Sequence, residues 1–182
     1  METSVSLLVM TFLKLKPDGP EELVAVLQRR GAFNHETLGP ESWPGACQLT
    51  VHGKVEPGEL NTDALWRETK EELGEGFAKT EDDWEDVIED VKIIGEVNKP
   101  GKTIKHCAIL IPPAWLKDIR LNASTDELRL VSQADLANIQ NLPATCNKQE
   151  GVRDKEALVM FPDEIEALKT AFTAFAGKPG TT

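Results

Sequence analysis

The most constraining feature of this chain is a run of carboxylates within residues 53–75. At 100° per residue, Glu68, Glu71 and Glu72 share an arc of about 100° on one helix. Like charges at i,i+4 repel each other by a few tenths of a kcal/mol, roughly, and a cation with a preference for oxygen ligands would reverse that penalty. Taken alone, such a helix is more typical of a solvated acidic face. The run reads Gly53-Lys-Val-Glu-Pro-Gly-Glu59, seven residues, then Arg67-Glu-Thr-Lys-Glu-Glu-Leu-Gly-Glu75.

The spacing of the whole run favours a specific site over a solvated face. It resembles the Nudix box, Gly-x5-Glu-x7-Arg-Glu-U-x-Glu-Glu-x-Gly-U, where U is an aliphatic residue. At average residue frequencies such a match arises by chance about once in 10⁸ starting positions. Thr69 and Glu75 depart from the pattern at its two U positions. The seven fixed positions are all matched, by Gly53, Glu59, Arg67, Glu68, Glu71, Glu72 and Gly74.

The resemblance implies a catalytic role for the three helix carboxylates. Glu68 and Glu72, usually with Glu71, would bind Mg²⁺ or Mn²⁺. Backbone carbonyls around His52–Gly53, that of Gly53 included, would complete the ligand shell. The reaction would be attack by metal-activated water on a phosphorus of a diphosphate linkage. The substrate would be a small nucleoside-diphosphate-linked or related metabolite.

The resemblance also implies residues that orient the ligands. Arg67 and Glu59 would be orienting residues rather than reactants, because Arg67 would hold Glu59 and Glu68 by charge-assisted hydrogen bonds. Family members often recruit a further carboxylate from outside the box. Glu127, beside Asp126 at the start of a strand-like run, is the first choice for that ligand, and Glu150 is the second.

Three residues outside the carboxylate set are candidates for substrate binding. Arg30 follows Arg29 at the end of a predicted strand, where the family often places a basic residue, although both arginines could equally be surface charge. Trp43 could stack on a base, but an aromatic residue before Pro-Gly more often serves packing. Lys54 directly follows the first glycine of the box. Lysines 99, 102 and 105 are typical of a solvated turn, and His106-Cys107 of a buried strand.

Two other functions remain open at this level. The lead-in from Trp43 to Gly53 is spaced as in isopentenyl-diphosphate isomerase, a Nudix relative. The chain has His52 where that enzyme has its catalytic cysteine and Lys54 where it has a metal-binding histidine, and it contains no tyrosine. The second alternative is a Nudix-like binding module without turnover. Such modules typically lose carboxylates of the box, whereas this chain keeps all of them.

Composition limits the partners and the compartment. The formal net charge of −11 disfavours binding to a nucleic-acid polymer. Three isolated cysteines predict a reducing, cytoplasmic location without disulfides. The apolar stretch Val5–Leu13 is too short to span a membrane, so no membrane association is expected. The resemblance adds a possible homodimer.

The order of strand-like and helical segments predicts an α/β fold with a central mixed sheet and helices on both faces, and the resemblance implies a Nudix-type α/β/α sandwich. One domain is expected over residues 1–176, followed by a flexible tail over residues 177–182. The main helix would be capped by Asn61 or Thr62 and end at Gly74. The loops 31–42 and 138–155 would recognise the leaving group. The other expected elements are strands over 5–16, 22–30, 47–51, 87–97, 103–111 and 128–131, an acidic connection over 81–85, a helical turn over 135–139 and a helix over 163–176.

Overall fold

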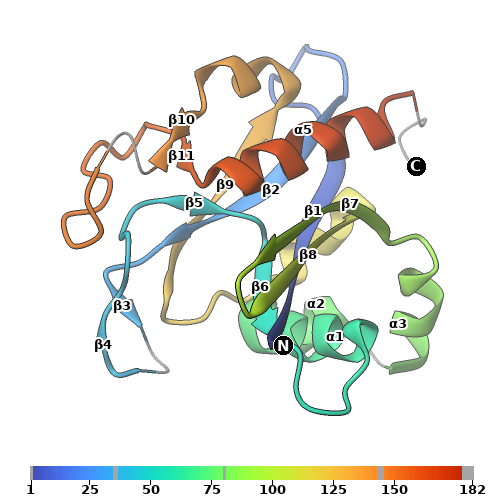
Figure 1. Ribbon diagram of the computed structural model, residues 1–182. Helices are drawn as coiled ribbons and strands as arrows, with labels where there is room; N and C mark the ends of the chain where they lie inside the picture. The colour runs from blue at the N-terminus through green and yellow to red at the C-terminus, as the bar shows by residue number, and fades with distance from the viewer. Residues whose placement is uncertain (1, 35–36, 80, 143–145, 178–182) are drawn as a thin grey trace.

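A seven-stranded mixed sheet forms the centre of the protein (Figure 1). The computed structural model describes residues 2–34, 37–79, 81–142 and 146–177. The strands run in the order β5-β2-β1-β8-β7, with β6 also paired to β1 and β9 also paired to β2. Among the described strand pairs of this sheet, only β1–β8 is parallel. The bounds are β1 Glu2–Leu13, β2 Glu22–Arg30, β5 Cys47–Gln48, β6 Val51–Lys54, β7 Lys92–Lys99, β8 Lys102–Leu110 and β9 Thr125–Ser132.

Helices cover both faces of this sheet. Helix α1 (Asn61–Leu73) packs on one face against Val5, Leu7 and Val9 of β1, and helix α5 (Pro162–Phe175) packs on the other against Leu8 and Met10. Figure 1 shows the two helices on opposite sides. Alternate residues of one strand thus enter two cores, and the predicted α/β/α sandwich is confirmed. The remaining elements are α2 (Glu75–Ala78), α3 (Glu81–Ile88), the 3₁₀ helices Pro113–Asp118 and Gln133–Asn138, and the short pairs β3 (Phe33–Asn34) with β4 (Gly39–Pro40) and β10 (Gln140–Asn141) with β11 (Val159–Met160).

The sheet forks at the middle of β1. Residues 9–13 of β1 pair with β2, whereas residues 4–7 pair with β6 along the same edge. The buried Thr50 fills the fork: its hydroxyl accepts a hydrogen bond from the Val9 amide at 2.8 Å and donates one to the Val26 carbonyl at 2.5 Å. Thr50 therefore satisfies two backbone groups at the point where the strands separate.

Several predicted element boundaries were wrong. The acidic connection expected over 81–85 is the first part of α3, because Trp84, Val87 and Ile88 lie at helical spacing and pack into the core on the α1 face. The strand expected from Val87 begins only at Lys92. Helix α1 begins after Leu60, and no side chain caps it. The predicted 47–51 strand is two strands, and Gly53 lies inside the second. Residues 178–182 of the expected tail lie outside the described residues.

No helix in the described part of the chain is both long and apolar enough to cross a membrane.

Replacing Thr50 with valine tests the fork. The loss of its hydroxyl leaves a buried amide and a buried carbonyl unpaired, and each such group costs roughly 1–3 kcal/mol. The free energy of unfolding of the variant should fall by about 2–4 kcal/mol, measured by urea denaturation. Thr69→Val is the matched control, because the equally buried Thr69 hydroxyl only adds a second bond to the Leu65 carbonyl within α1. Equal losses in both variants would contradict the role of Thr50.

Candidate active site

Side chains of α1 form hydrogen bonds to the edge of β6 that faces away from β1. The His52 amide donates to Glu72 Oε1 at 3.0 Å, and Arg67 Nη2 donates to the Lys54 carbonyl at 2.7 Å. The Lys54 amide also donates a hydrogen bond to Glu68. Among the described strands, β6 pairs with β1 alone. The helix therefore supplies the hydrogen bonds that a neighbouring strand would otherwise make.

Strand geometry decides which backbone carbonyl faces the carboxylates. In an antiparallel pair, the amide and carbonyl of one residue point together, either toward the partner strand or away from it. The His52 amide points away from β1, toward Glu72, so the His52 carbonyl shares that direction. Gly53 is the next residue, so its carbonyl faces β1. Of the two carbonyls expected to bind the metal, that of His52 is directed at the carboxylates of α1, whereas that of Gly53 points toward β1.

Gly53 contributes by having no side chain. A Cβ atom built on Gly53 would lie 1.9 Å from Cδ of Glu68 and 2.1 Å from its Oε1. These distances are far below van der Waals contact, so any side chain at this position would displace the Glu68 carboxylate. The glycine is needed for the close approach of α1 to β6.

Arg67 links the carboxylates as expected from the sequence. Its Nε and Nη2 donate to the two oxygens of Glu59 at 3.0 and 3.1 Å, and its Nη1 donates to Glu68 Oε1 at 2.7 Å. Glu71 Oε1 lies 3.6 Å from the same Nη1. The hydrogen bonds from Arg67 hold the pKa of Glu59 below its usual range. Burial has the opposite effect on Glu68 and raises its pKa in spite of Arg67.

Glu72 is the carboxylate whose charge is compensated least. One oxygen of Glu72 accepts the His52 amide, and the other, Oε2, accepts a hydrogen bond from Gln28 Nε2 at 2.9 Å. Burial raises the pKa of Glu72 to about 7, although His52 and these hydrogen bonds oppose the shift. Glu71 is different, because its side chain is 55% exposed. The site thus combines two buried carboxylates with one that solvent reaches.

These residues fit a divalent cation in donor chemistry. In the described residues, no three His, Cys, Asp or Glu side chains converge closely enough to form a metal site by themselves. Burial raises the pKa of both Glu68 and Glu72, in Glu68 in spite of Arg67. A hard cation beside their oxygens would compensate their negative charge. Together with Glu71 and the His52 carbonyl, they form a donor set made of oxygen atoms, as Mg²⁺ and Mn²⁺ prefer.

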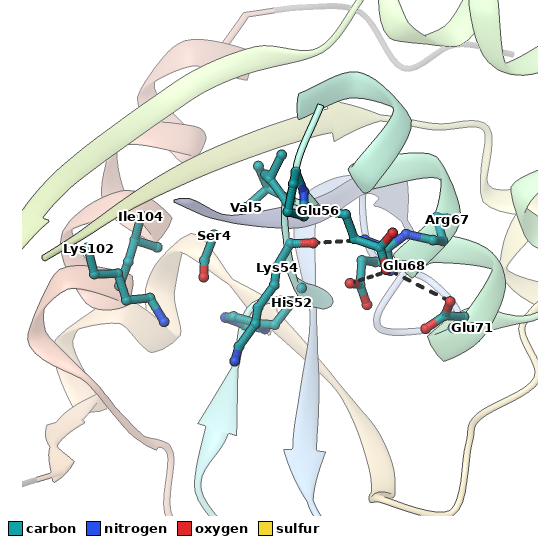
Figure 2. Close-up of a pocket in the computed structure, with 13 residues that line it drawn as sticks. Ser4, Val5, His52, Lys54, Glu56, Arg67, Glu68, Glu71, Lys102 and Ile104 are labelled. Atoms are coloured by element: carbon teal, nitrogen blue, oxygen red, sulfur yellow. Dashed lines mark hydrogen bonds and ion pairs between the residues drawn. The ribbon is translucent and has the colours of Figure 1, made fainter. Parts of the chain in front are cut away.

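Two cavities flank the carboxylates. The larger, about 560 Å³, extends from Glu68 and Glu71 past Lys54 to β1 and β8, and the smaller, about 140 Å³, lies toward β2. His52, Glu68 and Glu71 line both of them. In Figure 2, His52 and Lys54 lie between two groups of side chains of the larger cavity: Ser4, Ile104 and Lys102 on one side, Arg67, Glu68 and Glu71 on the other.

Two of the three substrate-binding candidates line these cavities. Lys54 lies in the larger one and Arg30 in the smaller one. Arg30 is held by hydrogen bonds to the Ser42 carbonyl, Gln48 and Glu41 at 2.5–2.8 Å. Lys102, taken as a solvated turn residue, also lines the larger cavity.

Trp43 lies elsewhere. Its ring packs edge-on against Phe161, with the centroids 5.9 Å apart, in a separate apolar cluster with Leu142 and Val159. The structure therefore supports the packing role weighed for Trp43 and does not place the ring where it could stack on a substrate.

The predicted outside carboxylate Glu127 lies on the wrong face of the sheet. Glu127 is paired in register with Arg29, one residue from Gln28, and successive side chains of a strand point to opposite faces. Gln28 contacts Glu72, so Glu127 faces the other way, 3.5 Å from Arg29. Asp126 also lies near Arg29, and Glu150 pairs with Arg153 on the surface. None of these acids joins the site.

Sequence reasoning missed two residues of the site, Gln28 and Glu164, and the position of the His52 ring. Gln28 bonds Glu72, as described above. The His52 ring lies on the α5 face, where its Nε2 is 3.0 Å from Glu164 Oε1 of α5. Burial works to lower the pKa of His52, but the charge of Glu164 and its hydrogen bond, with a contribution from Glu72, outweigh burial and raise it. In the sequence, each of these residues is a polar residue within a mostly apolar segment, and that pattern was the available signal for a buried polar contact.

The fold and site define a class of α/β protein in which a helix of carboxylates completes the open edge of a forked sheet. The model of the NUDIX domain family matches residues 10–151, and the chain belongs to this family of hydrolases. Nudix hydrolases act on pyrophosphate bonds in nucleoside diphosphate derivatives, generally with divalent metal ions. None of the curated proteins compared matches the chain.

Solved structures of Nudix proteins share the fold. A MutT/Nudix family protein from Listeria innocua superposes with a TM-score of 0.60 at 20% identity, covering 96% of this chain and 93% of its own. A Nudix hydrolase from M. smegmatis gives 0.53 at 16% identity, over 99% of this chain and 89% of its own. An Ap4A hydrolase from C. elegans gives 0.52 at 15% identity, over 98% and 100%. At these identities the likeness establishes the fold.

Substitution of Gly53 by alanine tests the close contact between β6 and α1. The new methyl group must displace Glu68, so the affinity for Mn²⁺ should fall by at least about tenfold, measured by calorimetric titration. Gly76→Ala is the control, because a Cβ on Gly76 would meet its nearest neighbour, the Asp118 carbonyl, at an ordinary 3.6 Å. Unchanged Mn²⁺ affinity in Gly53→Ala would contradict the contact.

The raised pKa of Glu72 predicts how stability depends on pH without metal. The carboxyl group titrates at about 7 in the fold against an ordinary value of 4.5. The folded state therefore binds its proton more tightly, and the stabilisation by that proton is lost as pH rises through about 7. Between pH 4.5 and 7 the melting temperature of the wild type should fall relative to that of Glu72→Gln, and saturating Mg²⁺ should remove the difference. If the difference in melting temperature between the wild type and Glu72→Gln does not change with pH, the raised pKa of Glu72 is contradicted.

Proposed function

We propose that the protein hydrolyses the diphosphate linkage of a small nucleoside-diphosphate-linked or related metabolite with Mg²⁺ or Mn²⁺. The observation that carries this proposal is the pair of buried carboxylates, Glu68 and Glu72, held on the open edge of β6 with raised pKa values. Burying an anion is costly when its charge is not fully compensated, and Glu72 accepts hydrogen bonds only from neutral donors. A divalent metal ion bound together with a diphosphate would supply the missing positive charge beside both cavities.

The proposed roles follow from the positions of the residues. Glu68, Glu72, Glu71 and the His52 carbonyl would hold the metal. When bound, a divalent ion acts as a Lewis acid on phosphate oxygens and lowers the pKa of a coordinated water. Arg67 and Glu59 would orient the Glu68 carboxylate, and Gln28 would do the same for Glu72.

Glu71 is the proposed general base. Its carboxylate is exposed to solvent and lines both cavities, so it can receive a proton from water and pass it to bulk solvent. The buried Glu68 and Glu72 lack such access. Lys54 and Arg30 would bind the two ends of the substrate, since each lines one of the cavities beside the carboxylates.

The domain organisation, cellular location and partners expected from the sequence are also proposals. Residues 1–176 would form one domain, and a cytoplasmic location is supported by Cys47, Cys107 and Cys146, all three of which are free. A homodimer and the exclusion of nucleic-acid polymers also remain to be tested, the latter supported by the net charge of −11.

A substrate screen tests the proposed function. Dinucleoside polyphosphates, nucleotide sugars, NADH and nucleoside triphosphates would be offered with Mg²⁺ or Mn²⁺, and phosphate would be measured after phosphatase coupling. We expect turnover of at least one class that stops with a chelator. No turnover on any of them would favour a binding module, and formation of dimethylallyl diphosphate from isopentenyl diphosphate would favour the isomerase.

The metal assignment has its own test in Glu72→Gln. Turnover should fall by more than about 100-fold, because even residues that only orient a metal ligand contribute about 10–100-fold. Glu75→Gln is the matched control: it removes the same charge three residues away, at a side chain that is 87% exposed and bound only weakly to Lys70 at 4.0 Å. Similar turnover in Glu72→Gln and the wild type would refute the assignment.

A further inference from the structure

A buried carboxylate on α5 contacts the site from the opposite face of the sheet. Glu164 lies in the first turn of α5, and its side chain is 9% exposed. One oxygen lies 3.0 Å from His52 Nε2, and the other accepts the Leu49 amide at 3.1 Å. Replacing a buried ion pair with apolar residues is often neutral or stabilising. Packing of α5 alone therefore does not require a carboxylate here, and the role of Glu164 lies in its two hydrogen bonds.

The two hydrogen bonds of Glu164 are to the first and last residues of the segment 49–52, which precedes Gly53, the glycine of the candidate site. Leu49 precedes Thr50 at the fork, and His52 gives its amide to Glu72. Strand β6 has four residues and, among the described strands, pairs with β1 alone. Its orientation therefore depends on contacts outside the sheet, and Glu164 provides them at both ends of residues 49–52.

The His52 ring has one anchor. Its Nδ1 is buried and forms no hydrogen bond within the described residues. The imidazole of His106, which lies on the same face and is buried, forms a hydrogen bond with the Ser6 hydroxyl through Nδ1 at 2.7 Å. Its Nε2 has no partner among the residues described. The bond between Nε2 of His52 and Glu164 thus fixes the rotation of the His52 side chain.

We propose that Glu164 is a positioning residue: by fixing His52 from the α5 face, it aims the His52 amide and carbonyl at the carboxylates of α1. Glu164 touches neither substrate nor metal in this role. The inference rests on the proposed function, because the direction of the His52 backbone affects activity only where this edge binds metal. Loss of Glu164 would let residues 49–52 rotate and weaken the contact between His52 and Glu72.

Three variants test the proposal. Glu164→Leu keeps the approximate volume and removes both acceptors. In Glu164→Gln, the amide oxygen can accept the Leu49 amide and the NH₂ group can donate to a neutral His52, so this variant should restore function. Asp163→Asn is the matched control. It removes a charge from the neighbouring residue, whose carboxylate pairs with Lys99 at 3.2 Å and contacts neither Leu49 nor His52.

The first readout needs neither metal nor substrate. Amide hydrogen exchange of residues 52–54 should accelerate about tenfold in Glu164→Leu, as expected when a hydrogen bond is lost, and exchange of Cys107–Leu110 in β8 should not. A loss of global stability would accelerate both segments. Equal acceleration of the two segments, or none, would overturn the proposal.

The second readout is metal binding and turnover. In Glu164→Leu the Kd for Mn²⁺ should rise about 10–100-fold and kcat should fall by a similar factor, with little change in the KM for substrate. Glu164→Gln and Asp163→Asn should stay within about threefold of the wild type, well inside that range. A wild-type Kd and kcat in folded Glu164→Leu would overturn the proposal.

A double-substitution cycle shows whether Glu164 acts through His52. His52→Phe should lower the affinity for Mn²⁺ as Glu164→Leu does. The affinity of the double variant should be no lower than that of the single variant that binds Mn²⁺ less tightly. Additive losses would overturn the proposal. If Glu164→Leu does not fold, Glu164→Asp replaces it, because a carboxylate one methylene shorter cannot reach both partners. Absence of turnover in the wild type would refute the proposed function while leaving the exchange result valid.

Discussion

The structure of the site depends on the unpaired edge of β6. A strand with one neighbour leaves amides and carbonyls that must find partners, and an open edge also invites pairing with other chains. Here Arg67, Glu68 and Glu72 of α1 meet that requirement. The same hydrogen bonds that satisfy the edge fix the carboxylates, so the stability of the strand and the geometry of the site have one origin.

This arrangement leaves an excess of negative charge in the site. Arg67 is shared between Glu59 and Glu68, and its nearest approach to the third helix carboxylate, Glu71, is 3.6 Å. Glu72 receives only neutral donors at hydrogen-bonding distance, from His52 and Gln28, and its pKa rises to about 7. If the proposed divalent cation binds here, it would stabilise the folded state, and its binding would depend on the order of the β6 edge.

Helical periodicity was enough to predict α1, and the order of the elements to predict a mixed sheet between helices. The resemblance carried by the box implied the link from Arg67 to Glu59 and Glu68. These features depend on local periodicity or on one short segment. Contacts between distant segments were not readable: His52 and Glu164 are separated by 112 positions, and Gln28 and Glu72 by 44. Glu127 was a reasonable choice until the register of β9 on β2 placed it on the other face.

The signals for the two missed residues were present in the sequence. Glu164 stands at i, i+3, i+4 and i+7 spacing with Ala167, Leu168 and Ala171, so helical periodicity alone puts this carboxylate on the apolar stripe of α5. Gln28 similarly ends an apolar run in β2. A polar residue at a core position requires a partner, but the sequence cannot say which one.

The two helices contribute differently to the site. Helix α1 brings its carboxylates to the edge of β6, and α5 holds the same strand from the opposite face through one buried carboxylate. Because the sheet lies between them, we expect a change at Glu164 to reach the carboxylates of α1 through the backbone of residues 49–52. That dependence explains why the site needs a sandwich: a single layer could present the carboxylates of α1, but it could not fix the strand that they bind.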